Sequence, residues 1–280
     1  MADPARVASS VRAHDERTEK SANRSASRHL TLLLSLAITA AWAAPAGAHS
    51  FGTPAVLKDI NPSGSSNPDG LTNVGGTLFF TATDGTSGLE LWKSNGTSSG
   101  TKRVKDINPG VGGSFPDQLT NVGGTLFFRA NDGTSGTELW KSNGTSAGTK
   151  RVKDINPGSG SSTPTSLTNT GGTLFFVADD GTSGRELWKS SGTSSGTRRV
   201  KDIHPTGSSG PSSLTNVGGT LFFNASDGTS GRELWKSDGT SSGTKRVKDI
   251  NPGAGNSFPD QLTNVGGTLF FNADDGTSGT

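Results

Sequence analysis

Residues 117–155 read DQLTNVGGTLFFRANDGTSGTELWKSNGTSAGTKRVKDI, and near-copies of this stretch fill the chain from about residue 55 onward. The segment LTN recurs at steps of 48, 48, 47 and 48 residues, starting at Leu71, Leu119, Leu167, Leu214 and Leu262. The segments ELW and KDI recur at the same spacing. A fixed period of this length identifies a tandem repeat, in which each unit buries its apolar surface against its neighbours.

Glycine-containing pairs divide each repeat into four candidate strands. In the second copy we expect strands at 117–122, 125–131, 137–142 and 149–155. The dipeptides between them are Gly-Gly, Asp-Gly and Asn-Gly, which are hairpin signals because Gly, Asn and Asp tolerate positive φ angles. No apolar pattern with a helical period survives between these turns. Each repeat is therefore predicted to form an antiparallel four-stranded meander.

The apolar residues of one repeat point to both faces of its sheet. Leu126 and Phe128 are predicted to face one side and Phe127 the other, and Leu139 and Trp140 alternate in the same way. A sheet with large apolar groups on both faces must be covered on both faces. Sheets stacked face to face around an axis provide that cover. We therefore predict an all-β fold, a β-propeller-like array of four-stranded antiparallel blades.

The repeat divides the chain into blades. Four complete blades are expected at 61–107, 108–155, 156–203 and 204–250, with a partial fifth at 251–280 and an N-terminal strand at 55–60. The last copy stops just before its ELW strand. We therefore expect the sequence to be truncated from a longer parent with five or more blades.

Residues 1–48 differ from the repeats and are predicted to be a signal peptide. A basic segment precedes the apolar run 30–44, which is followed by Ala46-Gly47-Ala48, the small-residue pattern of a cleavage site after Ala48. The run of 15 residues is shorter than the roughly 20 needed to span a bilayer. We expect a protein that is secreted or displayed at the cell surface, with no membrane span in the mature chain.

Charge and cysteine content exclude several classes of function. The chain carries 26 Lys and Arg and 24 Asp and Glu residues, and removal of residues 1–48 leaves 20 of each. A neutral mature chain provides no net field for nucleic acid, so no nucleic-acid partner is expected. The basic residues that recur in the fourth strand are interpreted as protection of an exposed edge, with a polyanion-binding belt as the alternative. Because the chain has no Cys, disulfides and thiolate sites are excluded.

The repeat resembles the bacterial ELWxxDGT repeat family. Residues 233–244, ELWKSDGTSSGT, carry the pattern intact, whereas the copies at 90–101 and 138–149 have Asn, and the copy at 186–197 has Ser, in place of the Asp. The resemblance covers essentially residues 55–280. It implies an extracellular or surface-associated protein with propeller-like blades, and it brings no catalytic residues to this chain.

Ligand contact is expected where the repeats differ from one another. Two such positions are the residue after the Phe pair and the residue before ELW. From these positions we take as candidate ligand-binding residues Arg129, Arg185, Arg232, Asn224 and Asn272. A scaffold that repeats its frame while varying exposed positions can build a composite binding surface. Extracellular polysaccharide and a surface protein are the two candidate partners.

Calcium is the one cofactor that the sequence suggests. An Asp residue opens the DGTSG turn of each repeat, at Asp84, Asp132, Asp180, Asp227 and Asp275. Calcium prefers six to eight oxygen ligands, and these turns are rich in them. The alternating ligand pattern of an EF-hand loop is absent, and Asp before Gly also forms turns without a metal. Both interpretations stay open here.

No catalytic set is recognised, so the chain is predicted not to be an enzyme. The glutamates of the ELW segments repeat once per blade in equivalent surroundings, whereas an acid–base pair needs two different environments. A non-catalytic module for binding, adhesion or structure is the first hypothesis. The alternatives are a secreted carbohydrate-active enzyme, with His204 as the hint of a specialised blade, and a calcium-stabilised structural spacer.

Overall fold

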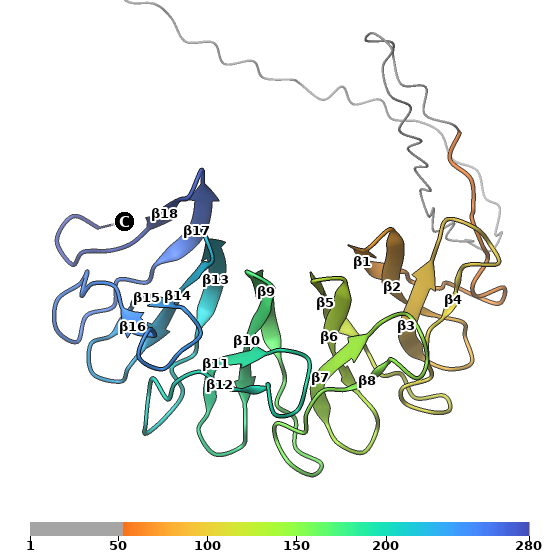
Figure 1. The fold of residues 1–280 in the computed structure, drawn as a ribbon, viewed down its shortest axis with the longest axis horizontal. Helices are drawn as coiled ribbons and strands as arrows, with labels where there is room; N and C mark the ends of the chain where they lie inside the picture. Colours follow the sequence, from red (N-terminus) through yellow and green to blue (C-terminus); the bar gives the residue numbers. More distant parts are fainter. Residues whose placement is uncertain (1–52, 280) are drawn as a thin grey trace, which may run out of the picture.

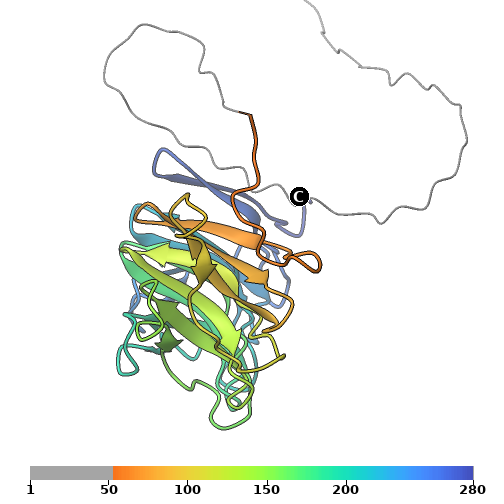
Figure 2. The ribbon, with the colours of Figure 1, turned by 90° about the vertical axis from the view of Figure 1, so that its right-hand side faces the viewer.

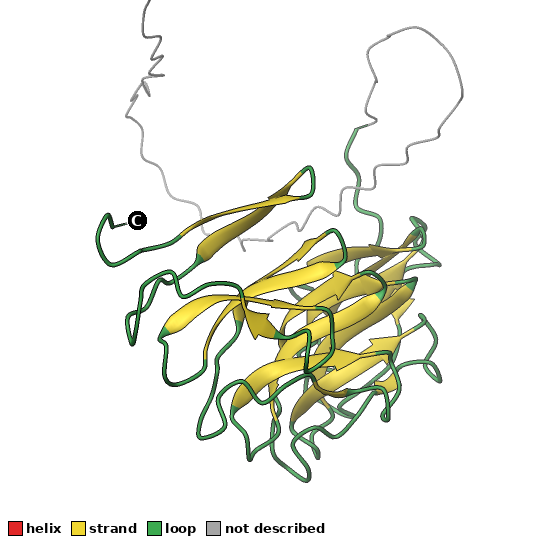
Figure 3. Ribbon diagram, turned by 60° about the vertical axis from the view of Figure 1, so that its left-hand side comes forward, coloured by secondary structure: helices red, strands yellow, loops and turns green. Residues whose placement is uncertain are grey.

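A computed structural model describes residues 53–279, and the signal peptide predicted for residues 1–48 lies outside them. In the described part, all regular secondary structure is β-strand. The strands form four four-stranded sheets and one two-stranded sheet. Within each sheet the strands follow chain order and neighbours are antiparallel. The predicted all-β meander is confirmed, and Figure 3 shows strands joined by loops throughout. Residues 53–279 contain no helix able to cross a membrane.

The strands recur with nearly the same lengths in every blade. The first blade comprises β1 (Asp69–Val74), β2 (Thr77–Thr83), β3 (Leu89–Ser94) and β4 (Lys102–Arg103). The second comprises β5 (Asp117–Val122), β6 (Thr125–Asn131), β7 (Thr137–Ser142) and β8 (Lys150–Arg151). The third comprises β9 (Thr165–Thr170), β10 (Thr173–Asp179), β11 (Arg185–Ser190) and β12 (Arg198–Arg199). The fourth comprises β13 (Ser212–Val217), β14 (Thr220–Ser226), β15 (Arg232–Ser237) and β16 (Lys245–Arg246), and the fifth β17 (Asp260–Val265) and β18 (Thr268–Asn272).

The blades stand side by side along an arc, with β1 and β2 at one end and β17 and β18 at the other (Figure 1). The first strand of each blade lies on the inner side of the arc and contacts the first strand of the next blade. Figure 2, turned by 90°, shows the sheets stacked against one another. This arrangement is a β-propeller-like array, as the two-faced apolar pattern predicts.

The hydrophobic clusters lie between blades. One cluster joins Phe79 of the first blade to Leu126 and Phe128 of the second. The next joins Phe127, on the opposite face of the second blade, to Phe176 of the third. The predicted orientations of the three residues in β6 are therefore confirmed. Each blade is stabilised by burying both its faces against neighbours, since burial of apolar side chains is the main favourable contribution.

The first hairpin of each blade is closed by two glycines with positive φ. In the first blade Gly75 has φ 57° and Gly76 has φ 84°, which is the type I′ geometry that matches the twist of the joined strands. The Gly76 amide donates to the Asn73 side-chain oxygen at 3.0 Å. The Asn of LTN thus closes this turn, and its backbone carbonyl accepts a bond from Asn121 Nδ2 of the next blade at 3.1 Å.

Two expectations about strands are wrong. The fourth strand of the second blade covers only Lys150–Arg151 and not 149–155, because the amide of Ile155 donates to the Glu138 carboxylate and not to a neighbouring strand. The segment 55–60 is not a strand either. It packs on the first blade through its side chains: Lys58 Nζ donates to the Thr101 carbonyl at 2.7 Å, and Ile60 is buried.

Candidate functional site

The glutamates of the ELW segments are buried and link consecutive blades. In the second blade, Glu138 Oε2 accepts hydrogen bonds from Ile155 N at 2.9 Å and Ser162 Oγ at 2.7 Å. Its other oxygen accepts from Asn156 N at 3.3 Å and Ser162 N at 3.0 Å. Ser162 lies in the loop that leads into the third blade. The carboxylate therefore holds the connection between two blades in place.

The same arrangement recurs in all four complete blades, so these carboxylates have a structural role. Glu90, Glu186 and Glu233 are also fully buried and each accepts three or four hydrogen bonds from the following loop. Burial raises the pKa of Glu90, Glu138 and Glu186, although the hydrogen bonds that they accept act in the opposite direction. Their oxygens are directed into the protein and are not presented to a ligand.

The Asp residues considered for calcium each organise their own turn. Asp132 Oδ1 accepts from Thr134 N at 2.9 Å, Thr134 Oγ1 at 2.9 Å and Ser135 N at 2.8 Å. Burial acts to raise the pKa of Asp132, but these hydrogen bonds outweigh it and hold the pKa below its usual value. In Asp275, the bonds from Ser278 and Thr277 lower the pKa to about 2. Within residues 53–279, no three His, Cys, Asp or Glu side chains are grouped as a metal site.

Arg185 and Arg232, expected to contact a ligand, bind neighbouring residues of their own blades. Arg232 Nη1 donates to the Gly210 carbonyl at 2.8 Å and to Asn224 Oδ1 at 2.6 Å. Arg185 donates in the same way to the Thr163 carbonyl and to Thr165 Oγ1. Both guanidinium groups therefore fill the space at the start of their blade's inner strand.

The two candidate asparagines also differ in their surroundings. Asn224 is buried, and its Nδ2 donates to the Pro259 carbonyl of the fifth blade at 2.7 Å. Asn272 is exposed on β18, where it is paired in register with Asp260 of β17. The structure does not bring Arg129, Arg185, Arg232, Asn224 and Asn272 into one site. Of these five, only Arg129 lines the pocket between the first two blades.

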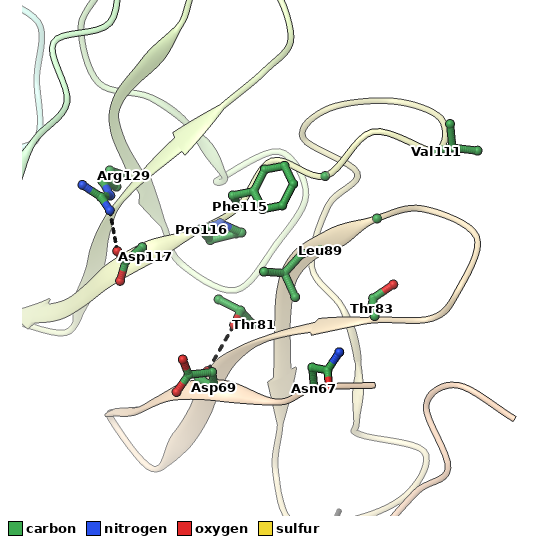
Figure 4. A pocket seen from close by; sticks show the side chains of 12 residues that line it. Asn67, Asp69, Thr81, Thr83, Leu89, Val111, Phe115, Pro116, Asp117 and Arg129 are labelled. Carbon is green, nitrogen blue, oxygen red and sulfur yellow. Dashed lines mark hydrogen bonds and ion pairs between the residues drawn. The ribbon is translucent and has the colours of Figure 1, made fainter. Parts of the chain in front are cut away.

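That pocket has a volume of about 720 Å³ and is open to solvent. Its polar side chains are Asn67, Asp69, Thr81, Thr83, Asp117 and Arg129. Its apolar side chains are Leu89, Val111, Phe115 and Pro116. In Figure 4 the Arg129–Asp117 pair lies on one side and Val111 on the other, with Phe115 and Leu89 between them. The volume falls in the roughly 300–1,000 Å³ range of small-molecule sites.

The charges of the pocket are only partly paired. Arg129 Nη2 lies 2.6 Å from Asp117 Oδ2, and the Asp117 side chain is about half exposed. Asp69 is exposed, and one of its carboxylate oxygens accepts the Gly70 amide at 2.7 Å. Thr81 Oγ1 lies 3.4 Å from the Asp69 carbonyl oxygen (Figure 4). The pocket thus combines hydrogen-bond donors and acceptors beside an apolar wall.

Leu89 keeps this pocket open. It occupies the position before the glutamate of ELW, which is held by Arg185 in the third blade and Arg232 in the fourth. The groups that Arg232 binds, Gly210 O and Asn224 Oδ1, belong to positions equivalent to Asn67 and Thr81 in the first blade. Leu89 has no guanidinium to reach those groups, so the corresponding space of the first blade is left unfilled.

Phe115 is the site residue that sequence reasoning missed. Its side chain is 66% exposed, and its φ of 49° lies in the left-handed region that a bulky residue rarely adopts. Neither burial nor backbone preference explains a Phe here, and the fourth blade has Gly210 at the equivalent position. The motif FPDQ, present only in the second and fifth copies, was the available signal. A motif present in two copies does not by itself indicate a ligand contact.

Comparisons with known proteins find structural similarity only. No family profile matches the sequence, and no curated protein matches it at a significant level. Solved structures that align with the chain include a puromycin hydrolase S511A mutant complexed with PGG, at 14% identity and a TM-score of 0.42. The alignment covers 73% of this chain and 32% of the hydrolase, so the chain spans about a third of that protein.

Two further structures align over comparable lengths. A protein provisionally assigned as TolB from Agrobacterium tumefaciens has 14% identity and a TM-score of 0.34, with 66% of this chain and 61% of that chain covered. A protein provisionally assigned as an exo-β-1,3-galactanase from Bifidobacterium bifidum S17 has 12% identity and a TM-score of 0.33, with 63% and 69% covered. Similarities of this degree indicate nothing about function.

The fold and the site together define a class of protein. The described residues form an array of β-propeller-like blades. The glutamate of each ELW segment binds the loop that enters the next blade. One junction between blades holds an open pocket of mixed polarity. These features are the basis of the functional proposal below.

Proposed function

We propose that this chain is a non-catalytic binding module of a secreted or cell-surface protein, with its ligand site between the first and second blades. The observation that carries the proposal is the contrast between Leu89 and Arg232. In the fourth blade the Arg232 side chain occupies the space at the start of the inner strand, whereas in the first blade Leu89 leaves a pocket of about 720 Å³ there. A departure from equivalence between units allows a repeat scaffold to form a single, localised ligand site.

The contacts of the acidic residues favour binding over catalysis. The buried glutamates are engaged by the loops between blades. The carboxylates that line the pocket, Asp69 and Asp117, are both exposed. A pair that divides acid and base roles needs environments that separate the two pKa values. Asp69 and Asp117 are both open to solvent, and neither lies in the buried surroundings that prepare a carboxyl group for proton transfer.

The mixed polarity of the pocket favours a binding module over a structural spacer. A spacer is expected to present only turns and paired side chains, whereas the large apolar side chains of Phe115 and Val111 are exposed at this pocket. The extracellular part of the proposal is supported by the signal-peptide pattern of residues 1–48 and by the resemblance to the ELWxxDGT repeat family. Export from a bacterial host, followed by N-terminal sequencing, tests the predicted cleavage after Ala48.

The site is tested by filling the pocket with the side chain that other blades use. Leu89→Arg introduces the residue of the third and fourth blades. Leu71→Arg makes the same change at an exposed leucine of the first blade that does not line the pocket, and serves as the matched control. The full-length wild type and both variants are screened by ligand-observed NMR against sugars, amino acids, amines and short fatty acids. We expect ligands that bind the wild type and Leu71→Arg but not Leu89→Arg. Equal binding by all three proteins contradicts the proposed site, and turnover of a bound compound contradicts the non-catalytic role.

A further inference from the structure

We propose that the pocket between the first two blades binds an uncharged saccharide. Phe115 supplies an apolar platform for one face of a sugar ring, and Asn67, Asp69 and Arg129 hydrogen-bond to its hydroxyl groups. This inference rests on the proposed function, because it names the ligand class of the same site.

The platform is the exposed face of Phe115. A sugar ring presents axial C–H groups on a face that is apolar enough to lie against an aromatic ring, whose face carries partial negative charge. Phe115 is held in place at its backbone, where its amide donates to the Leu89 carbonyl at 3.2 Å. Its left-handed φ directs the exposed ring toward the pocket beside Leu89, as Figure 4 shows. The equivalent residue of every other blade also has a positive φ, so the repeat itself sets this orientation: Asn67, Thr163, Gly210 and Phe258.

The polar groups match hydroxyls, because each hydroxyl both donates and accepts. Carboxylates accept only, guanidinium donates only, and an Asn side chain does both. Asp69 offers acceptors, and Arg129 offers donors beyond the one directed at Asp117. Asn67 offers its Nδ2 donors, because its Oδ1 already accepts from Ser65 Oγ at 2.7 Å. Hydrogen bonds to ionised groups are the stronger kind, so a few of them suffice to orient an uncharged ring.

The balance of charge in the pocket argues against a strongly charged ligand. An anion would find Arg129, the only cationic side chain among the lining residues, already in contact with Asp117 at 2.6 Å. A cation would compete with Arg129 for Asp117. Its attraction to the Asp69 carboxylate is weak, because that group is exposed and salt screens its charge. An uncharged ligand with many hydroxyls meets neither penalty.

The fifth blade contains an internal control, Phe258. It stands in the same FPDQ sequence, has φ 44° and is 59% exposed. The blade before it, however, carries Arg232 where the first blade carries Leu89, and Asn224 where it carries Thr81. The same aromatic residue therefore occurs once beside an open pocket and once beside a filled one.

The test uses the full-length protein with ¹³C-labelled Phe, with the resonances of Phe115 and Phe258 assigned by Phe→Leu substitution. The probes are cellobiose, lactose, mannobiose and chitobiose as uncharged sugars, with propylammonium, propionate and n-butanol for comparison. We expect at least one disaccharide to shift Phe115 but not Phe258, in the wild type and in Leu71→Arg but not in Leu89→Arg. We expect Phe115→Ala to weaken that disaccharide about tenfold, as loss of an aromatic contact of about 1.4 kcal/mol predicts.

The outcomes separate the two proposals. Shifts of Phe115 by n-butanol, propylammonium or propionate alone overturn the saccharide inference and leave the binding pocket standing. A disaccharide that shifts Phe115 and Phe258 equally, or that still binds Leu89→Arg, overturns the inference because the open pocket is then not the site. If no probe shifts Phe115, the saccharide inference and the proposed function both fail.

Discussion

The Ser114 hydroxyl of the loop entering the second blade donates a hydrogen bond of 2.6 Å to the Glu90 carboxylate of the first blade. The Ser114 amide donates to the same carboxylate at 3.0 Å. An equivalent Ser–Glu contact joins each complete blade to the one after it. The repeated glutamate is therefore an acceptor built into each junction. A buried carboxylate is tolerated there because donors surround it.

Glu138→Gln is expected to destabilise the protein by about 3 kcal/mol. The amide that replaces one oxygen cannot accept, so two of the four donors from Ile155, Asn156 and Ser162 lose their acceptor. Each buried donor left unsatisfied costs about 1–3 kcal/mol. Urea unfolding of the full chain measures the change. Asp238→Asn is the matched control, since other copies have Asn at this exposed position, and a similar loss in both variants would contradict the proposed role.

Much of the fold follows from local signals in the sequence. Glycine pairs such as Gly75-Gly76 mark the hairpins, and the opposed positions of Phe127 and Phe128 indicate that a sheet is covered on both faces. The short fourth strand was not predictable, because it depends on the Ile155 amide meeting a carboxylate from a distant part of the chain. A backbone group bound by a side chain leaves no mark in strand propensity.

The site was less predictable than the fold. The position of Leu89 was recognised as variable, but its importance comes from what its side chain fails to reach. That conclusion requires knowing that Arg232 spans from its own strand to Gly210. Phe115 could not be singled out from the sequence, because its motif also occurs in the fifth blade and repetition does not distinguish a ligand contact from a scaffold residue. Sequence variation between repeats identifies positions where a ligand contact is possible. The packing of the folded chain is needed to show at which of these positions a pocket is left.

Lys105→Met is expected to destabilise the junction between the first and second blades by about 1–2 kcal/mol. Lys105 Nζ donates to the Thr149 carbonyl of the next blade at 3.0 Å and lies 5.9 Å from the centre of the Trp140 ring. Met keeps the length of the side chain but loses the charged hydrogen bond and the cation–π contact. Urea unfolding provides the measurement. Lys102→Met, on the exposed strand β4, is the control and is expected to change stability by less than about 0.5 kcal/mol.

Gly136→Ala is expected to cost about 3 kcal/mol, and Gly123→Ala about 1 kcal/mol. Both glycines have positive φ, at 64° and 57°, so each Ala pays a conformational strain of about 1–2 kcal/mol. A Cβ on Gly136 would also overlap the carbonyl of Gly160, whereas nothing lies within 4 Å of a Cβ on Gly123. Overpacking adds about 1–3 kcal/mol. Equal melting temperatures for the two variants would show that the contact between the turn and the next blade is not close.

Asp132→Asn is expected to reduce the loss of stability in acid. The pKa of Asp132 is below its usual value in the folded protein, so its contribution is complete above the unfolded pKa of 3.8 and declines as the pH falls through the folded pKa. Asn keeps an acceptor for Thr134 and Ser135 at every pH, whereas Asp132→Ala removes it and is expected to cost about 1 kcal/mol even at neutral pH. Thermal unfolding at neutral pH and at about pH 3 compares the three proteins. The interpretation fails if Asn and Ala behave alike.

Calcium at millimolar concentration is expected to leave the melting temperature unchanged. Asp132 Oδ1 already accepts three hydrogen bonds, and the N–H and O–H groups of Thr134 and Ser135 point at the place where a cation would have to bind. In the first blade, Arg103 Nη1 also lies 3.7 Å from Asp84 Oδ2, which opposes a second positive charge. Calcium needs six to eight oxygens directed at it, so binding would require these turns to reorganise. A rise in the melting temperature of the wild type that is reduced in Asp132→Asn would instead show that the turns bind the metal. Magnesium at the same concentration controls for ionic strength.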